Sequence, residues 1–190
     1  MRASLTAILI FLALAPVAAA QEAQEAQEQS EAPPPSPRDV TREKLRAVLE
    51  AAGKLEDVKT TFRQGDKEPY NFLATIEDNL THTKMLEIVI RVTPNDTLGF
   101  RVFPHFKDGY INVDKVQDKA GLMRTMLHFN ERNFLFWGID EAGDVFSGYT
   151  ITLESGFPDA AVETVVRSLR NTDAFVGTLR PYIDGSRKAK

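Results

Sequence analysis

The three histidines are the side chains best suited to acid–base or metal chemistry in this chain. His82, His105 and His128 are scattered, and no two of them form an H-x-H or H-x-x-x-H pair. The chain also contains no cysteine, which excludes disulfides, thiolate metal ligands and a thiol nucleophile. We therefore expect no metal site.

Serine and carboxylate chemistry has no better support. Ser147 and Gly148 fall inside a predicted strand, without the strand-turn-helix setting that exposes a catalytic serine. Paired acids such as Asp140 and Glu141 lie in or beside predicted turns, where solvated carboxylates are common. We predict no catalytic or cofactor-binding residues and no cofactor. An enzyme would need distant acids that meet across a cleft, which a sequence does not show.

Aromatic side chains make up the candidate protein-contact surface. Pro104 and Phe106 interrupt regular strand pairing, so we expect residues 103–106 to be a sheet edge or a loop. The segment 134–139 is apolar on both sides and must be covered by helices of its own chain or by a second copy. Ordinary core packing is the alternative for the aromatic residues. The candidates are Arg101, Phe103, His105, Phe106, Phe134, Phe136 and Trp137.

The first half of the domain predicts a helix followed by strands. Residues 41–52 begin at Thr41, a suitable N-cap, and carry apolar side chains on one face. Residues 70–76, 85–93 and 98–102 alternate apolar with polar side chains, which predicts half-buried strands. A Pro-Asn-Asp turn joins the last two strands into an antiparallel hairpin.

The second half predicts a helix, a hairpin and a closing helix. Residues 118–130 form the helix, with Leu122, Met123, Met126 and Leu127 along one side. Residues 134–139 and 145–153 form the hairpin, and the closing helix begins near Pro158. It carries one apolar stripe and a break at residues 171–173; the stripe is Val162, Val165, Val166 and Leu169. The fold class is therefore α+β, an antiparallel sheet of about five strands with three helices in the order α-β-β-β-α-β-β-α.

Residues 1–20 have the three parts of a secretory signal peptide. Arg2 provides the positive start, an apolar run follows from Leu5 to Val17, and three alanines precede the expected cleavage after Ala20. The apolar run is shorter than the roughly 20 residues that a membrane span needs. We expect a periplasmic or secreted protein with no stable membrane insertion after cleavage.

Composition divides the rest of the chain. Residues 21–40 are acidic, rich in proline and free of large apolar side chains except at the end, which predicts a disordered linker. One α+β domain follows at residues 41–184, and residues 185–190 form a basic tail. Residues 1–39 hold two of the 23 basic and five of the 27 acidic residues, so the domain is nearly neutral. Its charge argues against nucleic acid, which demands a basic stripe.

A helix, a strand, a glycine turn, a second strand and a long helix follow one another over residues 122–169 (LMRTMLHFNERNFLFWGIDEAGDVFSGYTITLESGFPDAAVETVVRSL). In this order and apolar spacing the chain resembles the YbjN-like domain family, described as bacterial sensory transduction regulators, whose fold is similar to that of type III secretion chaperones. The resemblance implies a single α+β domain that is often dimeric and that binds rather than catalyses. It supplies no catalytic residues.

These observations favour an exported, non-catalytic protein-binding or chaperone-like module of the bacterial cell envelope. A regulatory role is one hypothesis for this module. Its partner is a protein of unknown identity, and a homodimer is compatible with the resemblance. The alternative is a periplasmic domain that binds a small ligand or a lipid, because helices packed over a sheet can enclose an apolar cleft.

The closing helix supplies a test of the predicted core. Val166→Asp should prevent folding, because it forces an unpaired carboxylate against the sheet. Thermal unfolding followed by circular dichroism measures this effect. A cooperative transition within a few degrees of the parent chain would show that the closing helix is wrongly placed.

Overall fold

The computed structural model describes residues 34–186. The predicted signal peptide, residues 21–33 of the predicted linker and residues 187–190 of the predicted tail lie outside the described residues. Among the helices that are described, none has the length and apolar character needed to cross a membrane. In chain order the elements are α2 (Pro37–Ala52), β1 (Arg63–Gln64), β2 (Asn71–Ile76), β3 (Met85–Val92), β4 (Thr97–Phe106), β5 (Gly109–Tyr110), α3 (Lys119–Arg132), β6 (Phe136–Ile139), β7 (Val145–Thr152), α4 (Asp159–Ser168), the 3₁₀ turn η1 (Leu169–Asn171) and α5 (Thr172–Ile183).

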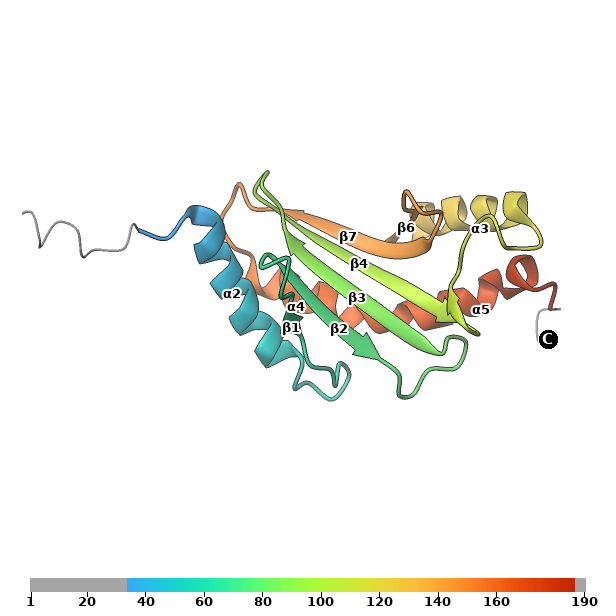
Figure 1. Cartoon of the computed structure of the whole chain (residues 1–190), viewed down its shortest axis with the longest axis horizontal. Coiled ribbons are helices and arrows are strands. Elements are labelled where there is room, and N and C mark those ends of the chain that lie inside the picture. The colour runs from blue at the N-terminus through green and yellow to red at the C-terminus, as the bar shows by residue number, and fades with distance from the viewer. Residues whose placement is uncertain (1–33, 187–190) are drawn as a thin grey trace, which may run out of the picture. The chain divides into compact units, whose positions relative to one another are not determined.

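All seven strands join one antiparallel sheet (Figure 1). Their spatial order is β1-β2-β3-β4-β7-β6, and β5 pairs with the end of β4. The predicted α+β class is correct, but the expected count of about five strands is too low. Because β1 and β5 have two residues each, they are too short to show a period of two in the sequence. The expected order α-β-β-β-α-β-β-α describes the longer elements, with the closing helix divided in two.

Helix α2 begins earlier than the sequence predicts. Its N-cap is Ser36 rather than Thr41, and Pro37 occupies the first helical position. The Ser36 hydroxyl accepts a hydrogen bond from the Asp39 backbone N–H at 3.2 Å, while the Asp39 carboxylate accepts one from the Ser36 N–H at 3.3 Å. This reciprocal pair is a capping box with aspartate in place of the usual glutamate. Residues 37–40, expected in the linker, therefore form the first turn of the helix.

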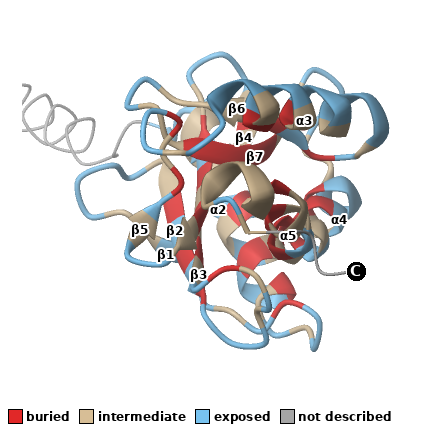
Figure 2. Ribbon diagram, turned by 90° about the vertical axis from the view of Figure 1, so that its right-hand side faces the viewer, coloured by how far each residue is buried: buried red, intermediate tan, exposed pale blue. Residues whose placement is uncertain are grey.

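One face of the sheet, called the inner face, packs against α2 and α4. Figure 2 shows the buried residues gathered between the sheet and the helices. On β4 the inner side chains Leu98, Phe100 and Val102 are each 0% exposed. The predicted stripe of α4 is buried against them, as are Leu45 and Leu49 of α2. Each large side chain buried in this way contributes about 1.5–3 kcal/mol to the free energy of folding.

A second, smaller core lies where α3 and α5 meet the β6 end of the sheet. It contains Leu122 and Met126 of α3 together with Trp137 of β6 and apolar residues of α5. Met123 and Leu127, which the sequence places on the same side of the helix, are instead 42% and 69% exposed. Because α3 contacts the rest of the domain along one narrow face, Leu122, Met126 and Phe129 lie in the second core while Met123 and Leu127 remain exposed.

The break between α4 and α5 follows the prediction at residues 171–173. A 3₁₀ turn separates the two helices, and Thr172 opens α5 in a fully buried position. Its hydroxyl lies 2.6 Å from that of Ser147 on β7, so each satisfies the other inside the core. Ser147 therefore has a structural role in fixing the helix break against the sheet.

Asp173, the next residue, ties α5 to the loop before β3. Its carboxylate, in a side chain only 8% exposed, accepts hydrogen bonds from the backbone N–H groups of Thr81, His82 and Thr83 at 2.8, 2.9 and 2.7 Å, and from the Thr83 hydroxyl at 2.7 Å. Burial alone raises the pKa of this carboxyl, but the four hydrogen bonds outweigh burial and hold the pKa below its ordinary value. One turn later, Gly177 leaves space for the His82 ring, which a side chain at that position would meet.

Asp173→Asn should lower the free energy of unfolding by about 1–3 kcal/mol at neutral pH, because the amide cannot accept all four hydrogen bonds. A carboxylate with a depressed pKa stabilises the fold above the pKa of the unfolded chain, about 4, and loses this contribution as the pH falls through the lower pKa of the folded state. The difference between the two chains should therefore be constant near neutrality and shrink in acid.

Urea unfolding over a series of pH values measures this difference. Asp159→Asn, an exposed acid in the first turn of α4, is the control and should change stability little. A difference that stayed the same down to the lowest pH would contradict the assigned role of Asp173.

Candidate functional site

The face of the sheet turned away from α4 and α5, called the outer face, is the main candidate surface. Figure 1 shows β2, β3 and β4 lying in front of α4 and α5, with no helix of the described chain across them. Outer side chains alternate with the buried inner ones, as in β3, where Glu87, Val89 and Arg91 are partly or fully exposed. The helices therefore leave this face of the sheet accessible.

A continuous row of aromatic rings crosses the outer face. We call it the aromatic row, and in spatial order it comprises Phe136 of β6, Phe146 of β7, Phe103 of β4, Tyr110 of β5 and His105 of β4. Centroid distances between successive rings are 6.0, 5.7, 5.9 and 4.3 Å. These separations lie in the range of favourable edge-to-face and tilted contacts. The row links the β4–β5 hairpin to the β6–β7 hairpin, which are separated by helix α3 in the sequence.

Two glycines lie directly beneath aromatic rings of the row. Gly138 pairs across the ladder with Phe146, and a Cβ at position 138 would lie 2.8 Å from that ring. Gly148 pairs with Phe136 and is covered by the Phe136 ring in the same way. Because each glycine has no side chain opposite an aromatic residue, the Phe146 and Phe136 rings occupy the space above Gly138 and Gly148 and meet each other edge to face, with 83° between their planes.

Next to the row lies a shallow hollow of about 450 Å³ on the outer face, with Gly99 in its floor. Nothing lies within 4 Å of the position that a Cβ of Gly99 would occupy. Phe103 and Phe136 of the row are among the residues that line the hollow, as are Arg91 and Arg101. Arg101 lies over the Phe146 ring, with its guanidinium carbon 4.6 Å from the centroid. The hollow thus combines an apolar floor with two cations.

At its other end the row terminates in a polar contact. The Tyr110 hydroxyl donates a hydrogen bond to Glu87 Oε2 at 2.8 Å, and His105 Nε2 lies 3.4 Å from the same oxygen. Burial, followed by the hydrogen bond to Glu87, raises the pKa of Tyr110 to about 12. The phenol therefore remains a hydrogen-bond donor at neutral pH and holds the Glu87 carboxylate in place.

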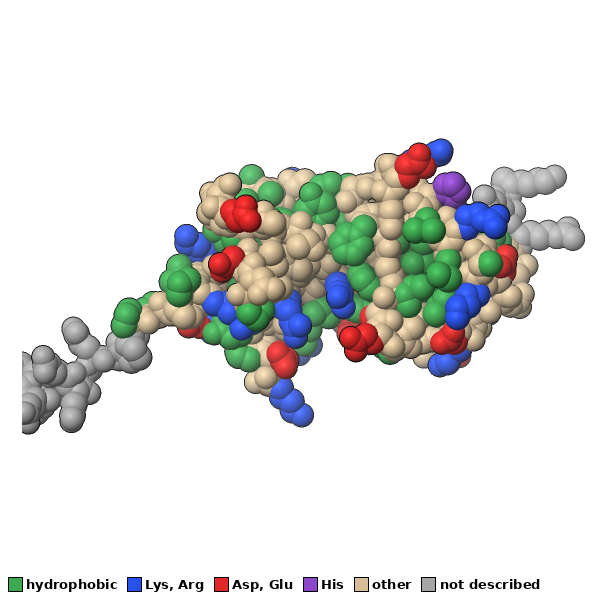
Figure 3. Space-filling view, turned by 90° about the horizontal axis from the view of Figure 1, so that it is seen from above, with side chains coloured by type: hydrophobic (Ala, Val, Ile, Leu, Met, Phe, Trp, Pro, Cys, Tyr) green, Lys and Arg blue, Asp and Glu red, His purple; other side chains and the backbone are tan. Residues whose placement is uncertain are grey.

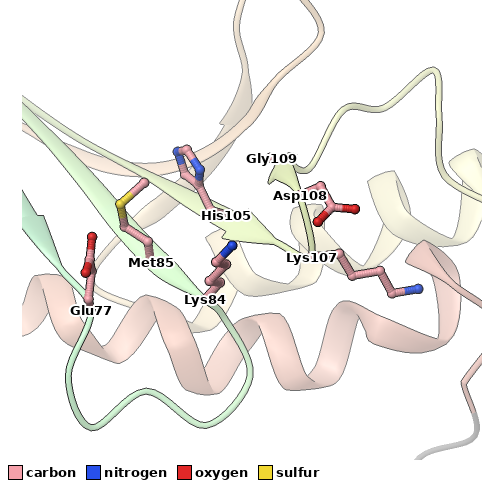
Figure 4. Close-up of a pocket in the computed structure, with 7 residues that line it drawn as sticks. All are labelled: Glu77, Lys84, Met85, His105, Lys107, Asp108 and Gly109. Carbon is pink, nitrogen blue, oxygen red and sulfur yellow. The ribbon is translucent and has the colours of Figure 1, made fainter.

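A second hollow, of about 280 Å³, lies at this end of β3 and β4 (Figure 4). In Figure 4 Met85 and His105, which are paired across the strands, point to the same side of the sheet. Two lysines and two acids line the hollow, so its charges nearly balance. The lining of this second hollow therefore carries less net positive charge than the lining of the hollow above Gly99.

The predicted candidate residues divide between the two faces. Arg101, Phe103, His105 and Phe136 lie together on the outer face, whereas Trp137 is buried in the second core against Phe129 and Phe175. Helices of its own chain therefore cover Trp137. The two remaining aromatic candidates also lie away from the row: Phe134 stacks on Tyr149 with centroids 4.4 Å apart, and Phe106 packs at the margin of the second core beneath Arg180.

The expectation that residues 103–106 form a sheet edge or a loop is wrong. They belong to β4, which lies inside the sheet, and Pro104 is in register with Leu86 of β3. On the other side of β4, Val102 is the last residue paired with β7 and His105 the first paired with β5. Pro104 lies in the gap between these two ladders, where a strand tolerates a missing N–H.

Phe146, Tyr110 and Gly99 belong to the site but were not predicted as candidates. A signal for Phe146 exists in the sequence, because residues 145–153 place it opposite the inner side chains. Tyr110 belongs to a strand too short to recognise, and a single glycine does not reveal an empty space above it. Only the pairing of β4 with β7 and β5 brings the three together.

The histidines remain separate in the structure, in agreement with their scatter along the chain. His82 packs on Gly177, His105 ends the aromatic row, and His128 is an exposed residue of α3 with Nδ1 3.8 Å from Glu131. Within residues 34–186, no group of three or more histidine or acidic side chains has a spacing suited to a metal ion.

The free edge of β6 is closed by a side chain of α3. Asn130 Oδ1 accepts a hydrogen bond from the Trp137 N–H at 2.6 Å, and Asn130 Nδ2 donates one to the Trp137 carbonyl at 3.1 Å. These are the two backbone groups that an added strand would use. The asparagine therefore takes the place of a neighbouring strand at this position.

Comparison with known proteins gives little further assignment. No family model matches the chain, and no curated protein matches it. Among solved structures it is similar to the "Crystal Structure of the ExsC-ExsE Complex", with 16% sequence identity and a TM-score of 0.44, covering 76% of this chain and 98% of that chain. A TM-score at this level does not establish a common fold. The resemblance to the YbjN-like family stays a prediction.

Gly148 and Gly99 form a matched pair on neighbouring strands. Gly148→Ala should lower the free energy of unfolding by about 1–3 kcal/mol, because its Cβ would collide with the Phe100 carbonyl oxygen. Gly99→Ala should leave stability unchanged or raise it by up to about 1 kcal/mol, because its Cβ enters open space. Urea unfolding of both variants checks the prediction. Equal effects at the two positions would contradict the described packing of the outer face.

Proposed function

We propose that this chain is a protein-binding module whose partner docks on the outer face of the sheet. The observation that carries the proposal is the aromatic row, which lies on the face that the helices leave uncovered and ends in Phe136 with 38% of its surface exposed. Aromatic side chains and arginine are enriched at the centres of protein interfaces. The row and Arg101 supply both.

The shape and charge of the surface agree with a protein partner. Figure 3 views the molecule from above Figure 1, at right angles to the view of the outer face, and on this side hydrophobic side chains are interspersed with basic and acidic ones. On the outer face itself the aromatic row lies beside Arg101, which agrees with an interface that has an apolar centre and a polar margin. The nearly neutral domain lacks the basic stripe that a nucleic acid would require.

The cellular setting and the chaperone-like role are part of the same proposal. The pattern of residues 1–20 supports export to the periplasm or beyond, and the resemblance to the YbjN-like family supports binding rather than catalysis as the activity. A regulatory chaperone of the cell envelope is the role that combines these two features with an accessible aromatic surface.

A second copy of the chain is proposed as a further partner at a different surface. Met123 and Leu127 are one helical turn apart on α3 and both are exposed, so they form a short apolar stripe on the helix. An antiparallel α3 helix from a second copy would cover this stripe and leave the outer face of the sheet accessible.

Photocrosslinking in cells tests the docking surface. A photoreactive amino acid at Thr150, an exposed residue that lines the hollow, should capture a protein of defined mass. Phe136→Ala should reduce the crosslinked fraction about tenfold or more, because an aromatic anchor at an interface contributes about 2 kcal/mol or more. Leu73→Ala is the control, since Leu73 lies on β2 with the same 38% exposure but outside the row.

Capture that is indifferent to Phe136→Ala would contradict docking on the aromatic row. Equal loss with Phe136→Ala and Leu73→Ala would also contradict it, because the row would then have no special part in binding. Circular dichroism of each variant confirms that the fold is retained.

A further inference from the structure

We propose that the hollow above Gly99 binds an extended, acidic segment of the partner protein, with an apolar side chain seated on Gly99 and a carboxylate paired with Arg101. This inference rests on the proposed function and specifies the chemistry of the partner. It assigns a peptide-binding subsite to a part of the outer face beside the aromatic row.

The charge of the lining indicates the sign of the charge that the partner segment carries. Twelve residues line the hollow, of which two are arginines and none is acidic. Arg101 forms no salt bridge with any residue in the described range 34–186, and its guanidinium lies over the Phe146 ring. Arg91 Nε donates a hydrogen bond to Asn71 Oδ1 at 3.0 Å, and its guanidinium forms an exposed salt bridge with Glu68 at 3.7 Å. The Arg101 guanidinium therefore remains available to an incoming carboxylate, and Arg91 adds positive charge beside it.

The register of the strands fixes the spacing of the two contacts. Gly99 and Arg101 are alternate residues of β4, so their outward positions are about 6.8 Å apart. Arg91 faces Gly99 across the ladder, which makes the two arginines diagonal neighbours, about 7–8 Å apart at Cβ. A peptide in extended conformation repeats its side chains on one face at the same interval. The fitting pattern is therefore an apolar residue with an acidic residue two positions away.

The open floor accounts for the apolar half of this pattern. Above Gly99 no atom lies within 4 Å of the missing Cβ. Arg91 and Thr150 are its partners across the two ladders, while Val89, which pairs with Arg101, and Phe103 line the hollow further along the strands. An aliphatic or aromatic side chain seated there removes its own apolar surface from water. The lysine-free rim and the near neutrality of the domain favour a short acidic peptide over a polyanion such as nucleic acid.

Docking on the outer face, rather than on the edge of the sheet, also agrees with the hydrogen bonds that close the β6 edge. Asn130 already occupies the backbone N–H and C=O of Trp137, so a peptide cannot add as a strand at this point of β6. The outer face of β4 offers side chains instead of backbone groups. Specificity then comes from the spacing of apolar and acidic residues.

Selection from a displayed library of random peptides against the full chain tests the inference. Enriched peptides should carry an acidic residue two positions from an apolar one, and their affinity, measured by fluorescence anisotropy, should fall with rising salt. Arg101→Gln should weaken an enriched peptide about tenfold, because it removes a charged hydrogen-bond donor. Gly99→Leu should abolish binding by filling the hollow, while Leu73→Ala should leave it unchanged.

Several outcomes would overturn the inference: no enrichment, enrichment of basic or uncharged peptides, or enriched peptides that bind Arg101→Gln and Gly99→Leu as well as the parent chain. Native mass spectrometry tests whether a small ligand, rather than a peptide, occupies the hollow. A carboxylate amphiphile that co-purifies with the parent chain and is lost from Gly99→Leu would assign the hollow to a small ligand instead.

The failure of this inference is distinguishable from failure of the proposed function. A protein captured at Thr150 and lost with Phe136→Ala, but bound equally by Arg101→Gln, would keep the protein-binding module and exclude the acidic segment. Thermal unfolding of Gly99→Leu shows whether this variant keeps its fold. Arg101→Gln changes only an exposed side chain, so its effect reports on binding alone.

Discussion

The whole structure depends on the alternation of side chains along β4. This strand pairs with β3 on one side and with β7 and β5 on the other, and it places Leu98, Phe100 and Val102 wholly inside the core. The intervening residues face away from the helices. A shift of one residue would exchange the two sets and bury Arg101 against the core, so the burial of three apolar side chains fixes the register. The same register places the candidate site.

Glycine has two opposite uses on the outer face. Gly138 and Gly148 leave space that neighbouring aromatic rings fill, so the β6 and β7 side of the face is closely packed. Gly99 leaves space that nothing in the described chain fills. The contrast separates a surface that is complete by itself from one that can accept a side chain from elsewhere.

Regular amphipathic elements were predictable from the sequence, whereas contacts between distant segments were not. The strands near residues 85–93 and 98–102 and the stripe of α4 follow directly from apolar periodicity. The two-residue strands lack enough positions to show a period. The start of α2 was missed because an aspartate at the third helical position takes the part of glutamate in the capping box. In α3 the apolar stripe is wider than its contact, so the sequence does not show that Met123 and Leu127 remain exposed.

For the site, the sequence correctly placed Arg101, Phe103 and His105 on one side of a strand, because alternation requires it. It could not join them to Phe136 or Phe146, since that depends on which strands become neighbours. The prediction for residues 103–106 was wrong because a proline inside a sheet usually costs a ladder hydrogen bond. Pro104 loses none, since it lies in the gap between the β7 and β5 ladders. Trp137 was misplaced for the converse reason: both sides of its strand are apolar, and only the position of α3 and α5 decides which side is enclosed.

The contact between Asn130 and Trp137 has a consequence for solubility. A protein that keeps an apolar surface open to solvent risks stacking with its own copies, and an unpaired outer strand would provide the template for such growth into fibrils. By saturating the two backbone groups of Trp137, one amide side chain denies that template to other copies at this point. Asn130 thus protects this point of the β6 edge from pairing with a strand of another copy, while the outer face of the sheet stays accessible.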